Sequence, residues 1–126
     1  MAIEKIIENG MTIAAVYSKE PIITDLQSAL DLIMTARHEL GAEQIVINKE
    51  AIASSFFILS SGLAGEILQK FVTYHMRLAI YGDYSGYASK PLHDFIYESN
   101  QGKAVFFLET KGVAVQKLAS LPQDGF

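Results

Sequence analysis

Two short apolar runs, residues 44–48 (QIVIN) and 77–82 (RLAIYG), constrain the fold of this chain more than any other feature. Each is apolar along most of its length, and each lies between segments with helical periodicity. A strand that is apolar on both faces fits a parallel sheet, because helices then cover both sides of it. The chain is therefore expected to form an α/β domain with a mainly parallel sheet and right-handed crossovers.

The N-terminal residues are expected to form an antiparallel hairpin at one edge of this sheet. Asn9-Gly10 separates two β-prone runs, residues 3–8 and 11–17. A two-residue hairpin turn needs residues that accept positive φ, and Asn-Gly is the strongest such signal.

Helix signals follow along the rest of the chain. A capping box formed by Thr24 and Gln27 predicts the start of the first helix, and Gly41 predicts its end. Further helices are expected over 63–71, 89–100 and 110–118, and a last strand over 103–109. The predicted order of elements is β-β-α-β-α-β-α-β-α.

Size and composition fit one domain over residues 1–126, with a frayed tail over 121–126. Of the 126 residues, 50% are hydrophobic and 19% are charged, which suits a single core. The N-terminal residues lack the uninterrupted apolar core of a signal peptide. Serines, glycines and Glu66 interrupt the most apolar window, 51–68, so no membrane span is predicted and we expect a soluble cytoplasmic protein.

Charge and residue types exclude several kinds of partner and site. The net charge is −4 and the 10 Lys and Arg residues are scattered along the sequence, so a nucleic-acid partner is not expected. The chain has no Cys, and His38, His75 and His93 are not spaced with another His or a carboxylate as in a metal motif. We expect three solvated surface histidines, no metal, no cofactor and no membrane contact.

The loops after the parallel strands are the expected place for a functional site. Ligands of such sheets bind beyond the carboxyl ends of the strands, where helix N-termini favour anions. The residues there that form the candidate ligand or partner rim are Asn48, Lys49, Asp83, Tyr84 and Ser85. A nucleophile elbow needs G-x-S-x-G, but the serine of GDYSG stands one place late, so no catalytic residue is assigned.

The region next to this rim is rich in aromatic residues, namely Tyr81, Tyr84, Tyr87, Phe95 and Tyr97. The favoured interpretation assigns them to the core and its margin, because Phe and part of each Tyr are usually buried. The alternative is an aromatic-lined binding rim around the aspartate and serine of GDYSG.

Ser60 and Ser61 stand at the start of the helix predicted over 63–71. The simpler interpretation is that one of them caps this helix, because serine is strongly preferred at that position. The other interpretation is a phosphorylation site, where added charge at a helix N-terminus is tolerated while the surface changes for a partner.

The segment LSSGLAGEIL, residues 59–68, resembles the D-S-S-G-L-G element of anti-sigma-factor antagonist (STAS, SpoIIAA-like) domains. The predicted order of elements is similar to theirs as well. This resemblance implies that a partner kinase phosphorylates Ser60 and that the unphosphorylated protein binds an anti-sigma kinase. The chain departs from the motif at Leu59, where the family has aspartate.

A closer likeness extends along the whole chain. The segments ITDLQSALDLI, IVINKEAI, LAGEILQKF, LAIYGDYS, SKPLHDFIYE and NQGK resemble an uncharacterised bacterial family, domain of unknown function 4180. This resemblance implies no activity and no functional residues.

Together these features predict a non-enzymatic cytoplasmic regulatory or protein-binding module, switched by phosphorylation at the start of the central helix. Its expected partner is another protein, and a homodimer is one alternative. The alternative function is a small-molecule-binding protein or minor enzyme that uses Asp83, Tyr84 and Ser85. A deep enclosed pocket at the rim would favour this alternative, and a flat convex rim with an exposed Ser60 would favour the first function.

Overall fold

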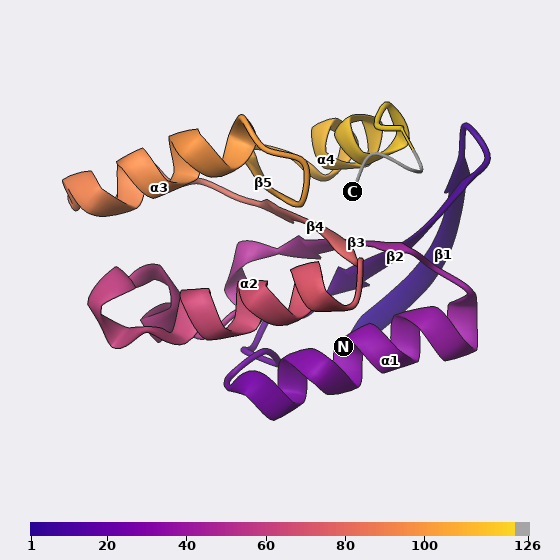
Figure 1. Cartoon of the computed structure of the whole chain (residues 1–126), viewed down its shortest axis with the longest axis horizontal. Coiled ribbons are helices and arrows are strands. Elements are labelled where there is room, and N and C mark those ends of the chain that lie inside the picture. Colours follow the sequence, from indigo (N-terminus) through magenta and orange to yellow (C-terminus); the bar gives the residue numbers. More distant parts are fainter. Residues whose placement is uncertain (123–126) are drawn as a thin grey trace.

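Five strands form one mixed sheet in the order β1-β2-β3-β4-β5 (Figure 1). The computed structural model describes residues 1–122. β1 (Ala2–Glu8) pairs antiparallel with β2 (Met11–Tyr17). The parallel part of the sheet consists of β2, β3 (Gln44–Asn48), β4 (Arg77–Tyr81) and β5 (Val105–Leu108).

The predicted hairpin is confirmed. Asn9 and Gly10 have φ values of 52° and 75°, as a two-residue turn with two left-handed positions requires. This turn sets Glu8 opposite Met11 and thereby fixes the register of the whole β1–β2 pair.

The described residues form four α-helices, which cover the two faces of the sheet unequally. They are α1 (Leu26–Leu40), α2 (Leu63–Thr73), α3 (Lys90–Asn100) and α4 (Lys111–Ala119). α1 and α2 lie side by side on one face, α3 packs against β5, and α4 lies on the opposite face (Figure 1). The larger core includes Ile33, Ile45 and Phe71, and the smaller one includes Phe106 and Leu118. The chain is thus a single compact α/β domain, which confirms the predicted class.

The first helix begins one residue later than the capping pattern predicts. Asp25, not Thr24, is the N-cap residue: Ser28 N donates to its Oδ1 at 2.8 Å. Asp25 N in turn donates to Ser28 Oγ at 3.1 Å, which completes a capping box. Hydrogen bonding to the carboxyl by the Ser28 backbone N–H, and next by the Ser28 side chain, holds the pKa of Asp25 below its ordinary value. The prediction of a Thr24–Gln27 box was wrong. The pairs Thr24–Gln27 and Asp25–Ser28 have the same spacing in the sequence, so spacing alone does not distinguish them.

Three short 3₁₀ turns join β3 to α2, and the periodicity of the sequence did not predict them. They are η1 (Lys49–Ala51), η2 (Ser54–Phe57) and η3 (Leu59–Ser61). Phe56 and Phe57 are buried and anchor this connection in the core.

A side chain of α3 covers the outer edge of β5. Asn100 Nδ2 donates to the Phe107 carbonyl at 3.0 Å, and Phe107 N donates to Asn100 Oδ1 at 2.7 Å. These two hydrogen bonds occupy the backbone N–H and C=O of Phe107, as an additional strand would. β1 forms the other edge and, within residues 1–122, pairs with β2 alone.

None of the helices within residues 1–122 is long and apolar enough to cross a membrane. The frayed tail expected over 121–126 falls mostly on residues 123–126, which lie outside the described part of the chain. Leu121 packs against the smaller core under α4.

Candidate functional site

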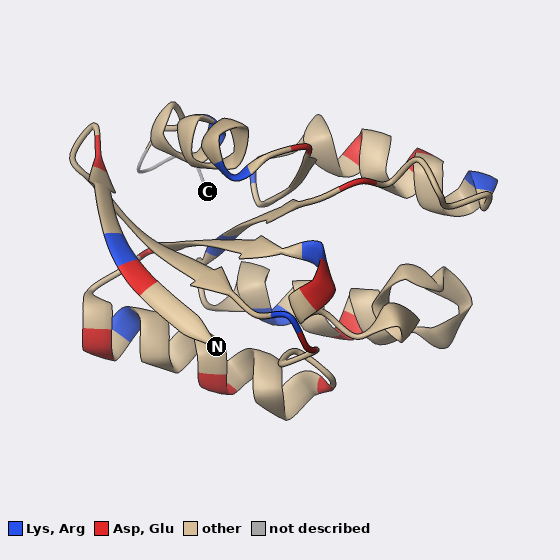
Figure 2. Ribbon diagram, turned by 180° about the vertical axis from the view of Figure 1, so that it is seen from behind, with Lys and Arg blue, Asp and Glu red and all other residues tan. Residues whose placement is uncertain are grey.

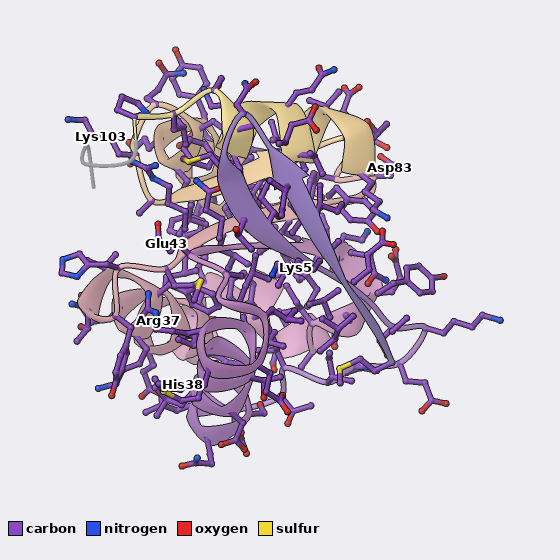
Figure 3. All side chains as sticks on the ribbon, turned by 90° about the vertical axis from the view of Figure 1, so that its right-hand side faces the viewer. Lys5, Arg37, His38, Glu43, Asp83 and Lys103 are labelled. Atoms are coloured by element: carbon purple, nitrogen blue, oxygen red, sulfur yellow. The ribbon has the colours of Figure 1, made fainter. Side chains whose placement is uncertain are left out.

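The carboxyl ends of the parallel strands form one edge of the molecule, and we call residues 48–50, 82–87 and 109 at this edge the carboxyl rim. Asn48 and Lys49 stand at the end of β3, and Asp83 to Ser85 follow β4. Figure 3 places Asp83 and Lys103, which precedes β5, on opposite sides of the molecule, as opposite ends of the strands require. The structure therefore brings all five predicted rim residues to one edge.

Asn48 is part of the framework beneath this rim. Its side chain is only 2% exposed. Ser18 N donates to Asn48 Oδ1 at 3.0 Å, and Asn48 Nδ2 donates to the Ser18 carbonyl at 2.7 Å and to Glu50 Oε1 at 3.3 Å. The amide thus ties the end of β2 to the end of β3, and its polar atoms are engaged by the chain itself.

Lys49 joins β3 to the loop after β4. Its Nζ donates to the Asp83 carbonyl at 2.7 Å and lies 5.0 Å from the centre of the Tyr87 ring. A Cβ added at Gly82 would stand 2.8 Å from Lys49 Cβ, so the lysine stem can cross β4 only where glycine stands. The cation is held over the rim by a backbone carbonyl and an aromatic face.

Asp83 and Ser85 are bonded to each other. Ser85 Oγ donates to Asp83 Oδ1 at 2.6 Å, and Ser85 N donates to the same oxygen at 2.9 Å. These two bonds, the hydroxyl first, hold the pKa of the Asp83 carboxyl below its ordinary value. The serine hydroxyl donates to a carboxylate whose lowered pKa makes it a weak base for activating a nucleophile.

An open hollow of about 440 Å³ lies beside this loop. It is lined by Gly82, Asp83, Tyr84, Ser85, His93 and Glu109. The sequence predicted His93 to be a solvated surface residue, and it is exposed, but its Nε2 bonds to the Tyr87 carbonyl, which fixes the ring at the wall. Its place in the first turn after the Ser89 cap was the signal that could have identified it, since that turn faces the rim.

Metal binding has no support in the described part of the chain. Within residues 1–122, no three His, Asp or Glu side chains are grouped so that they could hold a metal ion. Lys and Arg residues are dispersed over the elements instead of gathering on one face (Figure 2).

The aromatic residues near the rim divide into two sets. Tyr84 and Tyr87 pack against Phe57, with ring centres 6.2 Å and 5.4 Å away, and Phe95 packs against Phe107. The Tyr84 hydroxyl donates to the Ile80 carbonyl at 2.8 Å, and burial raises the pKa of this phenol strongly. These residues form the margin of the core, whereas Tyr97 is 68% exposed.

Ser60 and Ser61 have different surroundings at the start of α2. Ser61 Oγ donates to the Ser55 carbonyl at 2.7 Å and accepts from Leu63 N at 3.2 Å. Gly62, with φ of 78°, is the N-cap residue of α2. Ser61 therefore accepts the Leu63 N–H bond from the position before the N-cap. Ser60 is exposed, and its hydroxyl makes no hydrogen bond within residues 1–122.

The segment that carries Ser60 lies next to the carboxyl rim. Phe57, three residues before it, stacks on Tyr87 of the rim. The two parts of the candidate site are therefore connected through packed aromatic rings.

Comparison with known proteins gives a match to the model of a protein family. Neither a curated protein nor a solved structure matches this chain. The model of one family, described as Domain of unknown function (DUF4180), matches residues 8–118. The chain belongs to this family.

Proposed function

We propose that this chain is a non-enzymatic cytoplasmic regulatory module that binds another protein and is switched by phosphorylation of Ser60. The observation that carries this proposal is the contrast between two adjacent serines. The Ser61 hydroxyl is bound by backbone groups on both sides, whereas that of Ser60 is exposed and has no partner within residues 1–122. A kinase can therefore modify Ser60 without breaking a structural contact.

Phosphorylation would change the charge of this surface strongly. A phosphate adds about −1.5 to −2 charges at neutral pH. It would stand just before α2, where the positive end of the helix dipole favours an anion, so the helix is expected to persist. Glu66 lies in the first turn of α2, and the two groups would together make the surface acidic.

The surface next to Ser60 contains an apolar side chain that a protein partner could cover. Ile58 is 57% exposed, although the neighbouring Phe56 and Phe57 are buried. This surface therefore combines an exposed apolar side chain, which can contact a protein, with the Ser60 hydroxyl, to which a charged phosphate can be added. Such a surface would bind a partner when unmodified and repel an acidic partner when phosphorylated.

A STAS-like architecture is part of the proposal. The order of the elements and the position of the Ser60-Ser61-Gly62 segment directly before α2 support it. Leu59, where STAS domains have aspartate, makes recognition by a kinase of that family the step to test first.

Intact-mass measurement of the protein purified from its native host tests the switch directly. We expect a species heavier by one phosphoryl group under at least one growth condition. It should vanish in Ser60→Ala and persist in Ser54→Ala, a matched control at another exposed serine of the same connection. Absence of the heavier species under all conditions, or its persistence in Ser60→Ala, refutes phosphorylation at Ser60.

The binding half of the proposal needs a separate measurement. A partner captured by the wild-type protein and identified by mass spectrometry should bind Ser60→Asp more weakly and Ser54→Asp equally well. Equal binding by all three proteins would contradict the switch even if phosphate were found.

A small-molecule-binding protein or minor enzyme is the second candidate, because the 440 Å³ hollow gathers Asp83, Ser85, His93 and Glu109. The hollow is open rather than enclosed, so it lacks the deep pocket that would favour this second candidate, and the rim is not flat and convex either.

A further inference from the structure

A groove lies on the face of the sheet that α4 covers, between the β1–β2 hairpin and the first turn of α4. Its volume is about 250 Å³. It is lined by Ala2, Ile3, Glu4, Ala15, Val16, Tyr17, Val46, Tyr81 and Lys111. It lies apart from the Ser60 surface, which belongs to the face covered by α1 and α2.

The strand register explains why a groove forms here. Ala15 of β2 and Val46 of β3 are direct neighbours, and their short side chains make a low floor. In the next row, Asn48 of β3 is paired with Tyr81 of β4. Continuing the β2–β3 register by one residue beyond the Val16–Ile47 pair places Tyr17 on the other side of Asn48. Strands lie about 4.8 Å apart, so the two tyrosines stand roughly 10 Å apart with one strand between them. This spacing accommodates one planar ring.

The two tyrosines at this groove have free polar ends. Neither the Tyr17 nor the Tyr81 hydroxyl has a hydrogen-bond partner within residues 1–122, whereas the Tyr84 hydroxyl is bound to a backbone carbonyl. Burial raises the pKa of Tyr81, Lys111 acts in the opposite direction, and Tyr17 and Glu50 add smaller upward effects. The phenol of Tyr81 therefore remains a hydrogen-bond donor and lies within electrostatic range of the lysine.

An exposed ion pair stands at the mouth of the groove. Lys111 Nζ lies 2.7 Å from Glu4 Oε1, and the two side chains are 48% and 62% exposed. Exposed pairs of this kind contribute little to stability. A competing carboxylate can therefore take the place of Glu4 on the lysine at small cost.

We propose that this groove binds a single-ring aromatic carboxylate, with its ring between Tyr17 and Tyr81 and its carboxylate on Lys111. Among the lining residues, two phenols and one ammonium group can donate hydrogen bonds, against the one carboxylate of Glu4, and Glu50 acts on Tyr81 from outside the lining. The lining therefore favours an anionic ligand over a cationic one. The volume lies just below the range of about 300–1,000 Å³ that is usual for ligand pockets, which limits the ligand to one ring.

Titration of ¹⁵N-labelled protein with benzoate, followed by amide chemical shifts, tests this inference. We expect saturable shifts at Ala15, Val46 and Lys111, and none at Ser60. Benzamide has the same ring without the charge, and it should bind about tenfold more weakly because the charge-assisted contact is lost.

Three variants separate the groove from general attraction of anions. Lys111→Gln should weaken benzoate binding about tenfold. Glu4→Gln should strengthen it, because the competing carboxylate is removed. Lys103→Gln removes the same charge at the opposite end of the sheet and should leave binding unchanged (Figure 3).

All three substitutions replace exposed side chains, and far-UV circular dichroism of each variant checks that the fold is kept. Non-saturating shifts, equal binding of benzamide and benzoate, or equal losses in Lys111→Gln and Lys103→Gln would each overturn the proposal. Unchanged affinity in Glu4→Gln would show that the carboxylate does not bind at Lys111, and would overturn it as well.

Discussion

Replacing Asn48 by alanine is expected to destabilise the domain strongly. The amide bonds to both backbone groups of Ser18, and the two residues are only 2% and 6% exposed. Each buried polar group left without a partner costs about 1–3 kcal/mol, so losing both bonds should cost roughly 2–6 kcal/mol. This is a large share of the about 5–15 kcal/mol that stabilises a typical domain.

Urea unfolding followed by far-UV circular dichroism measures this loss, since the chain contains no Trp. With a slope of about 2 kcal/mol per molar urea, the midpoint should fall by roughly 1–3 M. Gln69→Ala is the control, because it removes an exposed amide whose bond to Thr73 is 3.5 Å long. It should change the free energy of unfolding by less than about 0.5 kcal/mol. A similarly small change in Asn48→Ala would refute the role given to the amide.

Asn48→Asp tests which of the two bonds matters. An ionised carboxylate still accepts from Ser18 N but cannot donate to the Ser18 carbonyl, and it faces Glu50. Burial and this neighbour raise its pKa in the folded state above the value of about 3.9 in the unfolded chain. A raised pKa gives stability at low pH that is lost as the pH rises through the folded value. The deficit relative to wild type should therefore grow from about pH 4 to 7, and a constant deficit would contradict this account.

Three further predictions concern single side chains at turns and helix starts. Gly82→Ala should cost about 1–3 kcal/mol in urea unfolding, because the new Cβ would lie 2.8 Å from a carbon of the neighbouring lysine. Asp25→Ala should lower the melting temperature, and Thr24→Ala should not. The Asp25 effect should fade as the pH falls below about 4, because the carboxyl has a lowered pKa and loses its contribution on protonation. Ser61→Ala should cost about 1 kcal/mol through its two lost bonds, whereas Ser60→Ala should leave stability unchanged.

Much of the fold could be predicted from local patterns in the sequence. The Asn9-Gly10 turn allows few alternatives, and the apolar run at 44–48 is wholly buried as β3. The start of the first helix was misplaced by one residue because Thr24 and Asp25 both cap well. The turns of residues 49–61 were missed, since 3₁₀ turns of three or four residues are too short to have a periodic pattern.

The candidate site was predictable in position but not in detail. Strand ends locate the rim, because the carboxyl ends of parallel strands share one edge. The partners of its side chains lie far away in the sequence: Asn48 bonds to a residue 30 positions earlier, and Lys49 to one 34 positions later. Local patterns carry no information about such pairs. The contrast between Ser60 and Ser61 likewise depends on the Ser55 carbonyl, which a turn brings into reach.

The amide of Asn100 has a consequence for how copies of this domain could assemble. By occupying the Phe107 backbone, it closes one side of the sheet to any additional strand. Within residues 1–122, growth of the sheet by strand addition is therefore directed to β1. That strand carries Glu4, Lys5 and Glu8. An incoming strand would therefore have to present charges complementary to these side chains and also pair with the backbone groups of β1.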